Sequence, residues 1–279
     1  MKIFDLHNDF LTTMRSYRAK NRYLSSKDLH NTQKIVGAVW TSELEPEKAL
    51  LEIEKSYDLI NTQNQNKNSC MLAIEDLHFV SKINIDRVIN ANPLYCGLTW
   101  NFNNNLAGGA LEGGNLTEFG KEVVELLEQN NIQIDTAHLS EKSFMDVASI
   151  TQKPIFCSHT AVASLTNHPR NLKDYQLKMI SESQGIVGIC LVSDFLSESK
   201  KSTIGDVARH IDYVASRFDP SIVALGTDFF GTKHLPKSIK NYNNLKCLEE
   251  RLRFMGYDTQ TIEMIFYKNA SNFFGMFEL

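Results

Sequence analysis

The sequence lacks the features of membrane, secreted and nucleic-acid-binding proteins. No window of about eighteen apolar residues occurs, which argues against a membrane-spanning helix. Lysine and arginine total 29 against 33 acidic residues, and they form no basic cluster that would bind nucleic acid. Polar and charged residues appear by position 5, which excludes a signal-peptide core. We therefore expect a cytoplasmic protein without a membrane or nucleic-acid partner.

Disulfides and a dinucleotide-binding motif are also missing from the pattern. An odd number of widely spaced cysteines indicates reduced, mostly buried thiols. No Gly-x-Gly-x-x-Gly follows the first predicted strand, which counts against a dinucleotide-binding open sheet. The five cysteines are Cys70, Cys96, Cys157, Cys190 and Cys247.

Eight short β-rich runs are present, with helix-like stretches between them. Each run is mostly apolar where it starts and becomes polar where it ends. Eight strand–helix units in 279 residues predict one catalytic domain over 1–279, folded as a closed (β/α)₈ TIM barrel. A doubly wound open sheet is the alternative. The runs are 2–9, 34–42, 70–77, 94–101, 132–140, 154–160, 185–192 and 222–229.

The clearest helices are expected between the later strands. Residues 118–130 place apolar side chains on one face, and Thr117 is suited to cap the helix. Residues 203–218 follow the same spacing and open with a capping box at Thr203. A third helix is expected over 258–274.

Imidazoles and carboxylates gather at the predicted strand ends. His7 and Asp9 end the first strand, where residues two apart project to one face. Glu75 ends the third strand, and His138 and His159 end the fifth and sixth. Each taken singly could be a hydrogen-bonded core residue. Because the carboxyl ends of barrel strands meet on one face, the set predicts a site for two divalent metal ions, zinc by ligand type, with Glu75 bridging.

Two further residues complete a hydrolytic site. Two metals about 3.5–4 Å apart would generate a bridging hydroxide that attacks an amide or ester carbon. Asp228, at the end of the eighth strand, is placed to move the proton to the leaving group, with a helix cap or a further metal ligand as its alternative role. Arg170 could hold a substrate carboxylate with two parallel hydrogen bonds, or be a solvated surface residue.

Several motifs resemble the membrane (renal) dipeptidase family. They are DLHND, IDTAHLS, IFCSHTA, the RN of HPRNL and ALGTDFFG, in that order, together with VGAVWT, GLTWN and YKNASNFF. The resemblance spans nearly the whole chain. It implies an amidohydrolase-like (β/α)₈ barrel that uses two zinc ions to hydrolyse dipeptides, often with a D-residue at the C-terminal position. It also implies a possible homodimer.

The resemblance assigns the same residues to roles. It implies that His7 and Asp9 bind one zinc, that His138 and His159 bind the other, and that Glu75 bridges them. It further makes Asp228 the acid/base residue near the substrate amine and Arg170 the carboxylate-binding residue.

The sequence departs from the family in the substrate shell. Trp100 stands where the family carries a histidine that assists at the substrate carbonyl, so we expect that assistance to be weaker or to come from Asn101 or Asn103. Phe230 replaces the second aspartate of a DFDG motif, and the chain is short for the family. Trp40 is expected in the core. Two alternatives remain: a binuclear amidohydrolase for another small amide, cyclic amide or lactone, and a metal-binding protein without catalysis.

Overall fold

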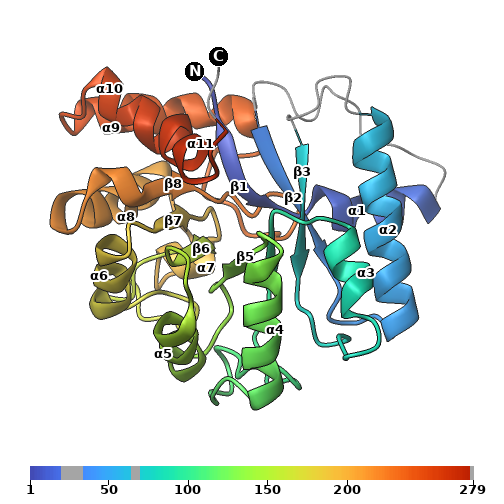
Figure 1. Ribbon diagram of the computed structural model, residues 1–279. Coiled ribbons are helices and arrows are strands. Elements are labelled where there is room, and N and C mark those ends of the chain that lie inside the picture. The colour runs from blue at the N-terminus through green and yellow to red at the C-terminus, as the bar shows by residue number, and fades with distance from the viewer. Residues whose placement is uncertain (20–33, 64–69, 277–279) are drawn as a thin grey trace.

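The eight predicted strands form a closed, all-parallel barrel in the computed structural model, which describes residues 1–19, 34–63 and 70–276. The strands follow one another in sequence order around the barrel, and β1 closes the ring by pairing with β8 at Asp5 and Leu225 (Figure 1). This closure confirms the barrel and rules out the open sheet. The strands are β1 (Phe4–Asn8), β2 (Lys34–Trp40), β3 (Cys70–Glu75), β4 (Tyr95–Gly97), β5 (Gln133–Asp135), β6 (Phe156–Thr160), β7 (Ile186–Ile189) and β8 (Val223–Leu225).

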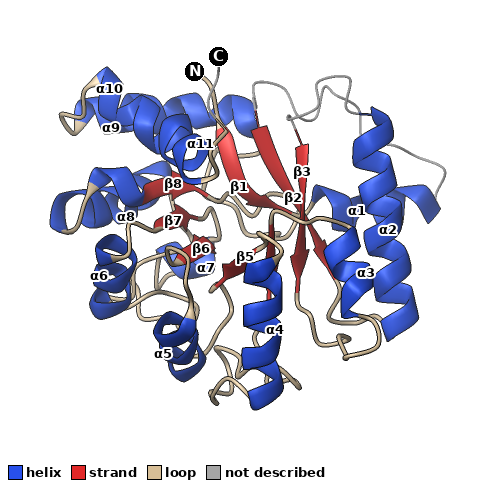
Figure 2. Ribbon diagram, in the orientation of Figure 1, coloured by secondary structure: helices blue, strands red, loops and turns tan. Residues whose placement is uncertain are grey.

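Helices surround this barrel and cover the outer faces of the strands (Figure 2). Two of the predicted caps are present. The Thr117 side chain accepts a hydrogen bond from the Gly120 amide at 2.9 Å, and Asp206 accepts one from the Thr203 amide at 2.7 Å. The helices up to β8 are α1 (Phe10–Ala19), α2 (Pro46–Gln63), α3 (Ile85–Asn90), α4 (Glu118–Gln129), α5 (Glu141–Ile150), α6 (Asp174–Glu182), α7 (Ser193–Leu196), α8 (Ile204–Arg217) and η2 (Pro220–Ile222).

The strands are shorter than the predicted runs because the backbone turns sharply at their polar ends. Asn101, His138 and Asp228 all have positive φ angles, of 62°, 68° and 58°. A non-glycine residue rarely adopts this left-handed conformation, and a β-strand cannot continue through it. The predicted runs 94–101 and 132–140 therefore end as strands at Gly97 and Asp135, and their last residues form the loops of the site.

The last helical segment closes the amino-terminal end of the barrel. The predicted helix over 258–274 is interrupted by a π-helical turn, η4, where the ring of Tyr267 packs on Phe4 at 6.3 Å. Phe274 stacks on Phe4 from the same side, at 6.2 Å. In barrel enzymes the active site lies at the other end, where the carboxyl ends of the strands meet. The segments after β8 are η3 (Tyr242–Leu245), α9 (Lys246–Phe254), α10 (Thr259–Glu263), η4 (Met264–Lys268) and α11 (Asn269–Phe273).

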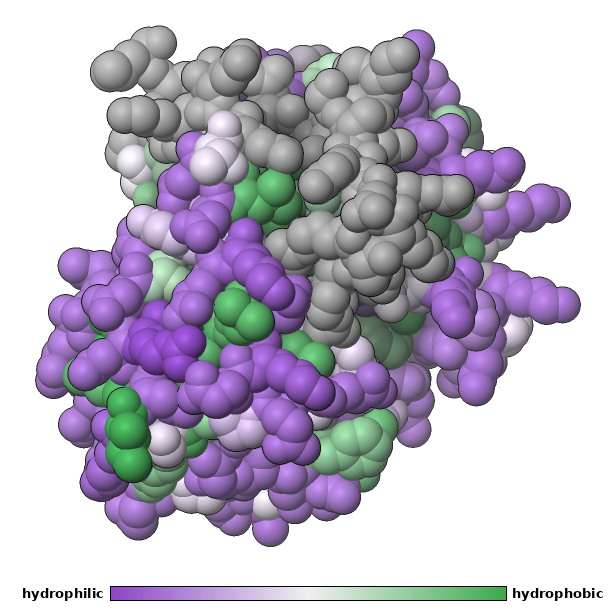
Figure 3. Space-filling view, turned by 90° about the vertical axis from the view of Figure 1, so that its right-hand side faces the viewer, coloured by the Kyte–Doolittle hydropathy of each residue, from purple (hydrophilic) through white to green (hydrophobic). Residues whose placement is uncertain are grey.

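The molecular surface and the cysteines can be compared with what the sequence predicts. Where its atoms are coloured, the face in Figure 3 is mainly hydrophilic with a few separate apolar side chains. No helix in the described ranges is long and apolar enough to cross a membrane. None of the five cysteines forms a disulfide, and three are buried, whereas Cys70 is half-buried and Cys247 is exposed. The expected single domain over 1–279 stays a prediction, since 20–33, 64–69 and 277–279 lie outside the described residues.

Candidate active site

The five predicted metal ligands meet at the carboxyl end of the barrel. Glu75 lies at the centre, with its Oε1 atom 2.8 Å from His138 Nε2, 3.7 Å from His159 Nε2 and 3.8 Å from His7 Nε2. The Oδ2 atom of Asp9 lies 3.5 Å from the same nitrogen of His7. All five side chains are buried. They form two triads of potential ligands that share Glu75, namely His7–Asp9–Glu75 and Glu75–His138–His159.

The three histidines all present Nε2 to this cluster because a neighbour occupies each Nδ1. The Tyr95 hydroxyl lies 2.8 Å from His7 Nδ1 and donates its own proton to the Leu6 carbonyl, so it accepts the proton of His7. His138 Nδ1 donates to the Asn101 side-chain oxygen at 2.8 Å. Such outer partners fix the tautomer of a metal-binding histidine and leave the Nε2 lone pair for the metal.

The third histidine has a longer chain of support. His159 Nδ1 lies 2.8 Å from the Ser158 hydroxyl, which donates in turn to Oδ2 of the buried Asp135. The Ser158 amide donates to the other oxygen of Asp135 at 2.8 Å. Asp135 therefore orients His159 through Ser158 although it lies below the cluster.

The cluster concentrates negative charge in a buried space. Burial alone would lower the pKa of His7, but the carboxylates of Asp9, Glu75 and Asp228 raise it to about 10. Burial and the neighbouring Asp9 raise the pKa of both Glu75 and Asp228 well above the usual range. The carboxylates repel one another in this buried space and therefore hold protons more tightly, and a divalent cation there would neutralise their negative charge.

The residues present fit two divalent metal ions. His7 Nε2 is buried and has no hydrogen-bond partner among the described residues, although its ring is otherwise held in place. Burial, with help from the positive charges of Arg170 and His7, lowers the pKa of His138 and His159, which keeps both imidazoles neutral. Neutral imidazoles and carboxylate oxygens are the ligands that zinc takes in catalytic sites.

Asp228 lies directly beside this cluster. Its amide donates to the His7 carbonyl at 3.0 Å, which fixes the turn after β8 against the end of β1. Gly231 completes the turn, and a Cβ atom there would lie 2.1 Å from Oδ1 of Asp228 and 2.3 Å from Oδ2 of Asp9. The two carboxylates therefore converge at a point that only glycine leaves open.

Arg170 reaches the site from the loop after β6. Its side chain is buried, its Nη2 atom lies 2.9 Å from His159 Nε2, and its guanidinium lies 5.4 Å from the centre of the Phe195 ring. Its Nε atom has no hydrogen-bond partner, and no carboxylate of the described chain forms an ion pair with it. A buried guanidinium without a counter-ion is suited to receive an anionic group of a ligand.

A cleft of about 420 Å³ lies over these residues. Trp100 lines it with its ring 5.8 Å from that of His138, and Trp40 lines it beside Trp100. The expectation that Trp40 belongs to the core is therefore wrong. Asn101 also lines the cleft, whereas Asn103 does not, and its side-chain oxygen accepts from the Gly109 amide.

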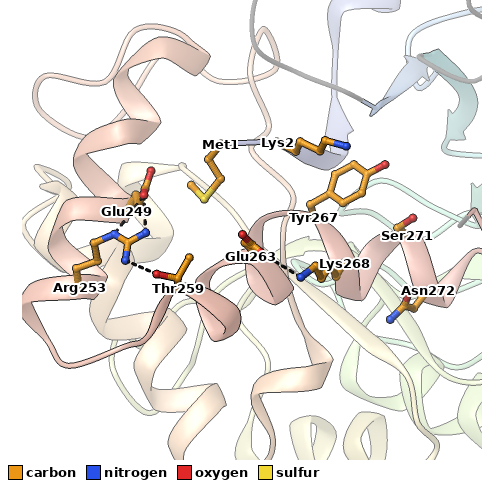
Figure 4. Close-up of a pocket in the computed structure, with 10 residues that line it drawn as sticks. All are labelled: Met1, Lys2, Glu249, Arg253, Thr259, Glu263, Tyr267, Lys268, Ser271 and Asn272. Atoms are coloured by element: carbon orange, nitrogen blue, oxygen red, sulfur yellow. Dashed lines mark hydrogen bonds and ion pairs between the residues drawn. The ribbon is translucent and has the colours of Figure 1, made fainter. Parts of the chain in front are cut away.

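A larger cavity of about 660 Å³ lies at the opposite end of the barrel, between the start of β1 and the last helices (Figure 4). Four of its charged side chains form two ion pairs, Arg253 with Glu249 at 2.9 Å and Lys268 with Glu263 at 2.6 Å, and Lys2 lies over the Tyr267 ring. It contains no histidine. Because the active sites of barrel enzymes lie at the carboxyl ends of the strands, we assign the smaller cleft as the candidate active site.

Comparison with known proteins agrees with this geometry. A family model described as membrane dipeptidase (peptidase family M19) matches residues 20–278. The chain belongs to the membrane dipeptidase family. The matched range begins after His7 and Asp9, so the match to the family model does not include these two residues.

Two curated proteins are similar to part of the chain. An uncharacterized protein from the pqqA 5′ region of Klebsiella pneumoniae is 32% identical over 171 residues. An uncharacterized dipeptidase of Schizosaccharomyces pombe is 29% identical over 198 residues. These matches span 60% and 66% of this chain, and the chain spans only 63% and 48% of the two relatives.

A solved structure supports the fold over the full length. A metallopeptidase from Rhodobacter sphaeroides, liganded with a phosphinate mimic of the dipeptide L-Ala-D-Ala, superimposes with a TM-score of 0.85 at 22% identity. The alignment covers 99% of each chain. At this identity the likeness establishes a shared barrel.

Sequence reasoning missed the residues that support the ligands. Tyr95 and Ser158 contact histidines directly and Asp135 acts on His159 through Ser158, and each was part of a run interpreted only as strand. Asn101 was considered as a donor to substrate, but its oxygen orients His138. Asp135 offered one signal, because a carboxylate inside an apolar strand needs a buried partner.

Proposed function

We propose that the chain is a metallo-dipeptidase that hydrolyses the peptide bond of dipeptides with two divalent ions, which are Zn²⁺ by the ligand types. The observation that carries this proposal is the pair of ligand triads that share Glu75. The unpaired guanidinium of Arg170, at the edge of the same cluster, supports a substrate with a free carboxylate. Membership of the family supports the same reaction class.

Each polar group has a place in this reaction. His7, Asp9, Glu75, His138 and His159 would hold the two ions, which supply the Lewis acidity that activates water and polarises a carbonyl. Arg170 would bind the terminal carboxylate and so set the direction of the dipeptide in the cleft. Asp228, beside Asp9, would bind the substrate amine and transfer the proton to the leaving nitrogen.

Several finer features belong to the same proposal. The relative solved with an L-Ala-D-Ala mimic supports a D-residue at the C-terminal position of the substrate. We also propose that 1–279 act as one catalytic domain, that the protein works in the cytoplasm and that it forms a homodimer, as family members often do.

Hydrolysis of a panel of L,L- and L,D-dipeptides by Zn²⁺-loaded protein tests the proposal. We expect cleavage that a chelator abolishes and that returns when Zn²⁺ is restored. Elemental analysis of the same sample should give two metal ions per chain. Absence of any cleavage by protein that holds two ions would contradict the dipeptidase proposal.

One observation favours a second candidate. Trp100 covers the cluster beside His138, and an indole cannot exchange protons as the family's histidine can. A binuclear amidohydrolase for another small amide, a cyclic amide or a lactone would need less help at that point. Cleavage of such compounds in place of dipeptides would support this candidate, and failure to cleave either class would favour a non-catalytic metal protein.

A further inference from the structure

The active-site cleft has a charged floor and an apolar wall. The charged residues that line it are those already assigned to the ligand cluster and its two neighbours, Arg170 and Asp228. Above them the wall carries Trp40, Trp100, Val192, Phe195 and Phe230. The floor is suited to the polar backbone of a dipeptide, and the wall must therefore contact its side chains.

The two tryptophans form one continuous surface. Their rings meet edge to face with centroids 5.3 Å apart, and both side chains are half-buried. The hydroxyl of Thr12, which also lines the cleft, is already engaged: it accepts from the Trp40 amide at 2.7 Å and donates to the Ala38 carbonyl at 3.1 Å. This side of the cleft therefore offers a ligand mainly aromatic surface.

Phe230 adds an independent signal from the other side of β1. It has a φ angle of 68° and is 40% exposed, whereas the neighbouring Phe229 is buried against Tyr242. A bulky residue in the left-handed conformation is strained. Because the ring is partly exposed, the free energy gained by burying it offsets little of that strain. Strain of this kind at a cleft indicates a ligand contact.

The order of the strands assigns this surface to one end of the substrate. Asp228 and Phe230 share the turn after β8, and Trp40 ends β2, so the two rings flank β1 and its Asp9. Phe195 contacts the guanidinium of Arg170 and the ring of His168, whose centroid is 4.5 Å away, at the other end. Trp40 and Phe230 therefore lie on either side of Asp9, at the amine end of the proposed substrate, and Trp100 extends the surface of Trp40 toward His138.

We propose that Phe230, Trp40 and Trp100 form a specificity pocket for a large apolar or aromatic side chain on the N-terminal residue of the dipeptide. This inference rests on the proposed dipeptidase function. It identifies the substrate class as dipeptides such as Phe-Ala rather than Ala-Ala or Ala-Phe.

Matched substrates and variants test the pocket. We would measure kcat/KM of the Zn²⁺-loaded protein for Phe-Ala, Ala-Phe and Ala-Ala, each with an L- and a D-residue at the C-terminal position. We expect Phe-Ala to exceed both others by at least about tenfold, the scale at which a hydrophobic pocket discriminates. In Phe230→Ala and in Trp100→Ala, the ratio of Phe-Ala to Ala-Ala should fall at least about threefold.

The control is Phe254→Ala, which removes an 81% exposed ring from α9, outside the cleft. It should keep the wild-type ratio. Equal rates for the three dipeptides, a preference for Ala-Phe, or an unchanged ratio in both cleft variants would overturn the pocket and leave the dipeptidase function standing. Chelator-sensitive cleavage of none of the dipeptides would overturn both proposals.

Discussion

Asp228 is proposed to transfer a proton without binding a metal ion, so its substitution should affect turnover but not metal content. Its carboxylate converges with that of Asp9 but belongs to neither ligand triad. We expect Asp228→Asn to keep two metal ions per chain and to lower kcat about 10²–10⁴-fold, because an amide cannot carry the proton. Steady-state kinetics and elemental analysis of the same preparation measure both quantities.

A matched control for this substitution is Asp86→Asn on α3, where the carboxylate is exposed. It makes the same chemical change away from the cleft and should leave kcat at the wild-type value. If Asp228→Asn turned over at the wild-type rate, Asp228 would have no part in the proton transfer.

Tyr95 is the residue that we expect to control the first triad from outside. Its hydroxyl accepts from His7 Nδ1 and donates to the Leu6 carbonyl, so Tyr95→Phe removes the group that fixes the imidazole. Loss of such a partner typically weakens metal affinity about 10–100-fold. Competition with a chelator should show that one of the two ions dissociates more readily, while the ion at Glu75–His138–His159 is retained.

Tyr242→Phe provides the comparison, because that buried hydroxyl bonds to Asn8 and Asp5 and touches no ligand of either triad. It also removes a buried hydroxyl and should lower stability by an amount of the order of 1–3 kcal/mol without changing either metal affinity. Equal metal affinities in the two variants would show that Tyr95 is only structural.

At the scale of elements, two glycines allow β6 to approach its neighbours closely. A Cβ atom at Gly188 of β7 or at Gly226 after β8 would lie 1.9 or 1.8 Å from the Ser158 carbonyl oxygen. That oxygen belongs to backbone and cannot move aside without shifting His159. We expect Gly226→Ala to lower the free energy of unfolding in urea by about 3 kcal/mol or more.

Gly205→Ala, in the first turn of α8, is the control, because its Cβ would meet Thr203 Oγ1 at 3.4 Å and Arg251 Nε at 4.0 Å, both ordinary contacts with side chains. Alanine restricts the unfolded chain, so this variant should be unchanged or more stable by up to about 1 kcal/mol. Equal stability of the two variants would contradict the close approach at Ser158.

The same elements show what a sequence can and cannot predict. The eight strands and the barrel were predicted from short apolar runs with polar ends that alternate with helix-like stretches, because buried strands have this pattern. The left-handed turns at His138 and Asp228 did not, because local sequence signals carry no information on how a loop packs against other strands. The supporting contact between Tyr95 and His7 joins residues 88 positions apart, so only the closed barrel reveals it.

The lining of the cleft was predicted less completely than the cluster of three histidines and two carboxylates. Histidines and carboxylates at strand ends are conspicuous because they are costly to bury without partners. Aromatic residues such as Trp40 and Phe230 have a normal place in a core, so their position in the cleft becomes visible only in the fold. The prediction of the site was therefore fullest where the chemistry is unusual for a protein interior.

For the whole molecule, stability should depend on pH through His210. This side chain is fully buried between the loop after β6 and α7, where Nδ1 accepts from the Val162 amide at 3.0 Å and Nε2 lies 3.2 Å from the Leu196 carbonyl. Burial lowers the pKa of His210 from 6.5 to about 4. The unfolded chain therefore binds a proton first as the pH falls from about 6.5, and it gains stability relative to the native state.

The size and sign of this effect can be isolated with one variant. Between pH 7 and pH 5 the shift in the pKa of His210 corresponds to a loss of about 2 kcal/mol of native stability. His210→Gln should be less stable than wild type at pH 7, because its fit to both backbone partners is poorer, but it lacks this proton. The stability difference between the two proteins, measured by urea denaturation, should therefore shrink as the pH falls to 5. Because the two proteins share the proposed metal ligands, comparing them at each pH cancels the effect of protonating those ligands. A stability difference that stays constant between pH 7 and pH 5 would mean that His210 does not titrate in this way.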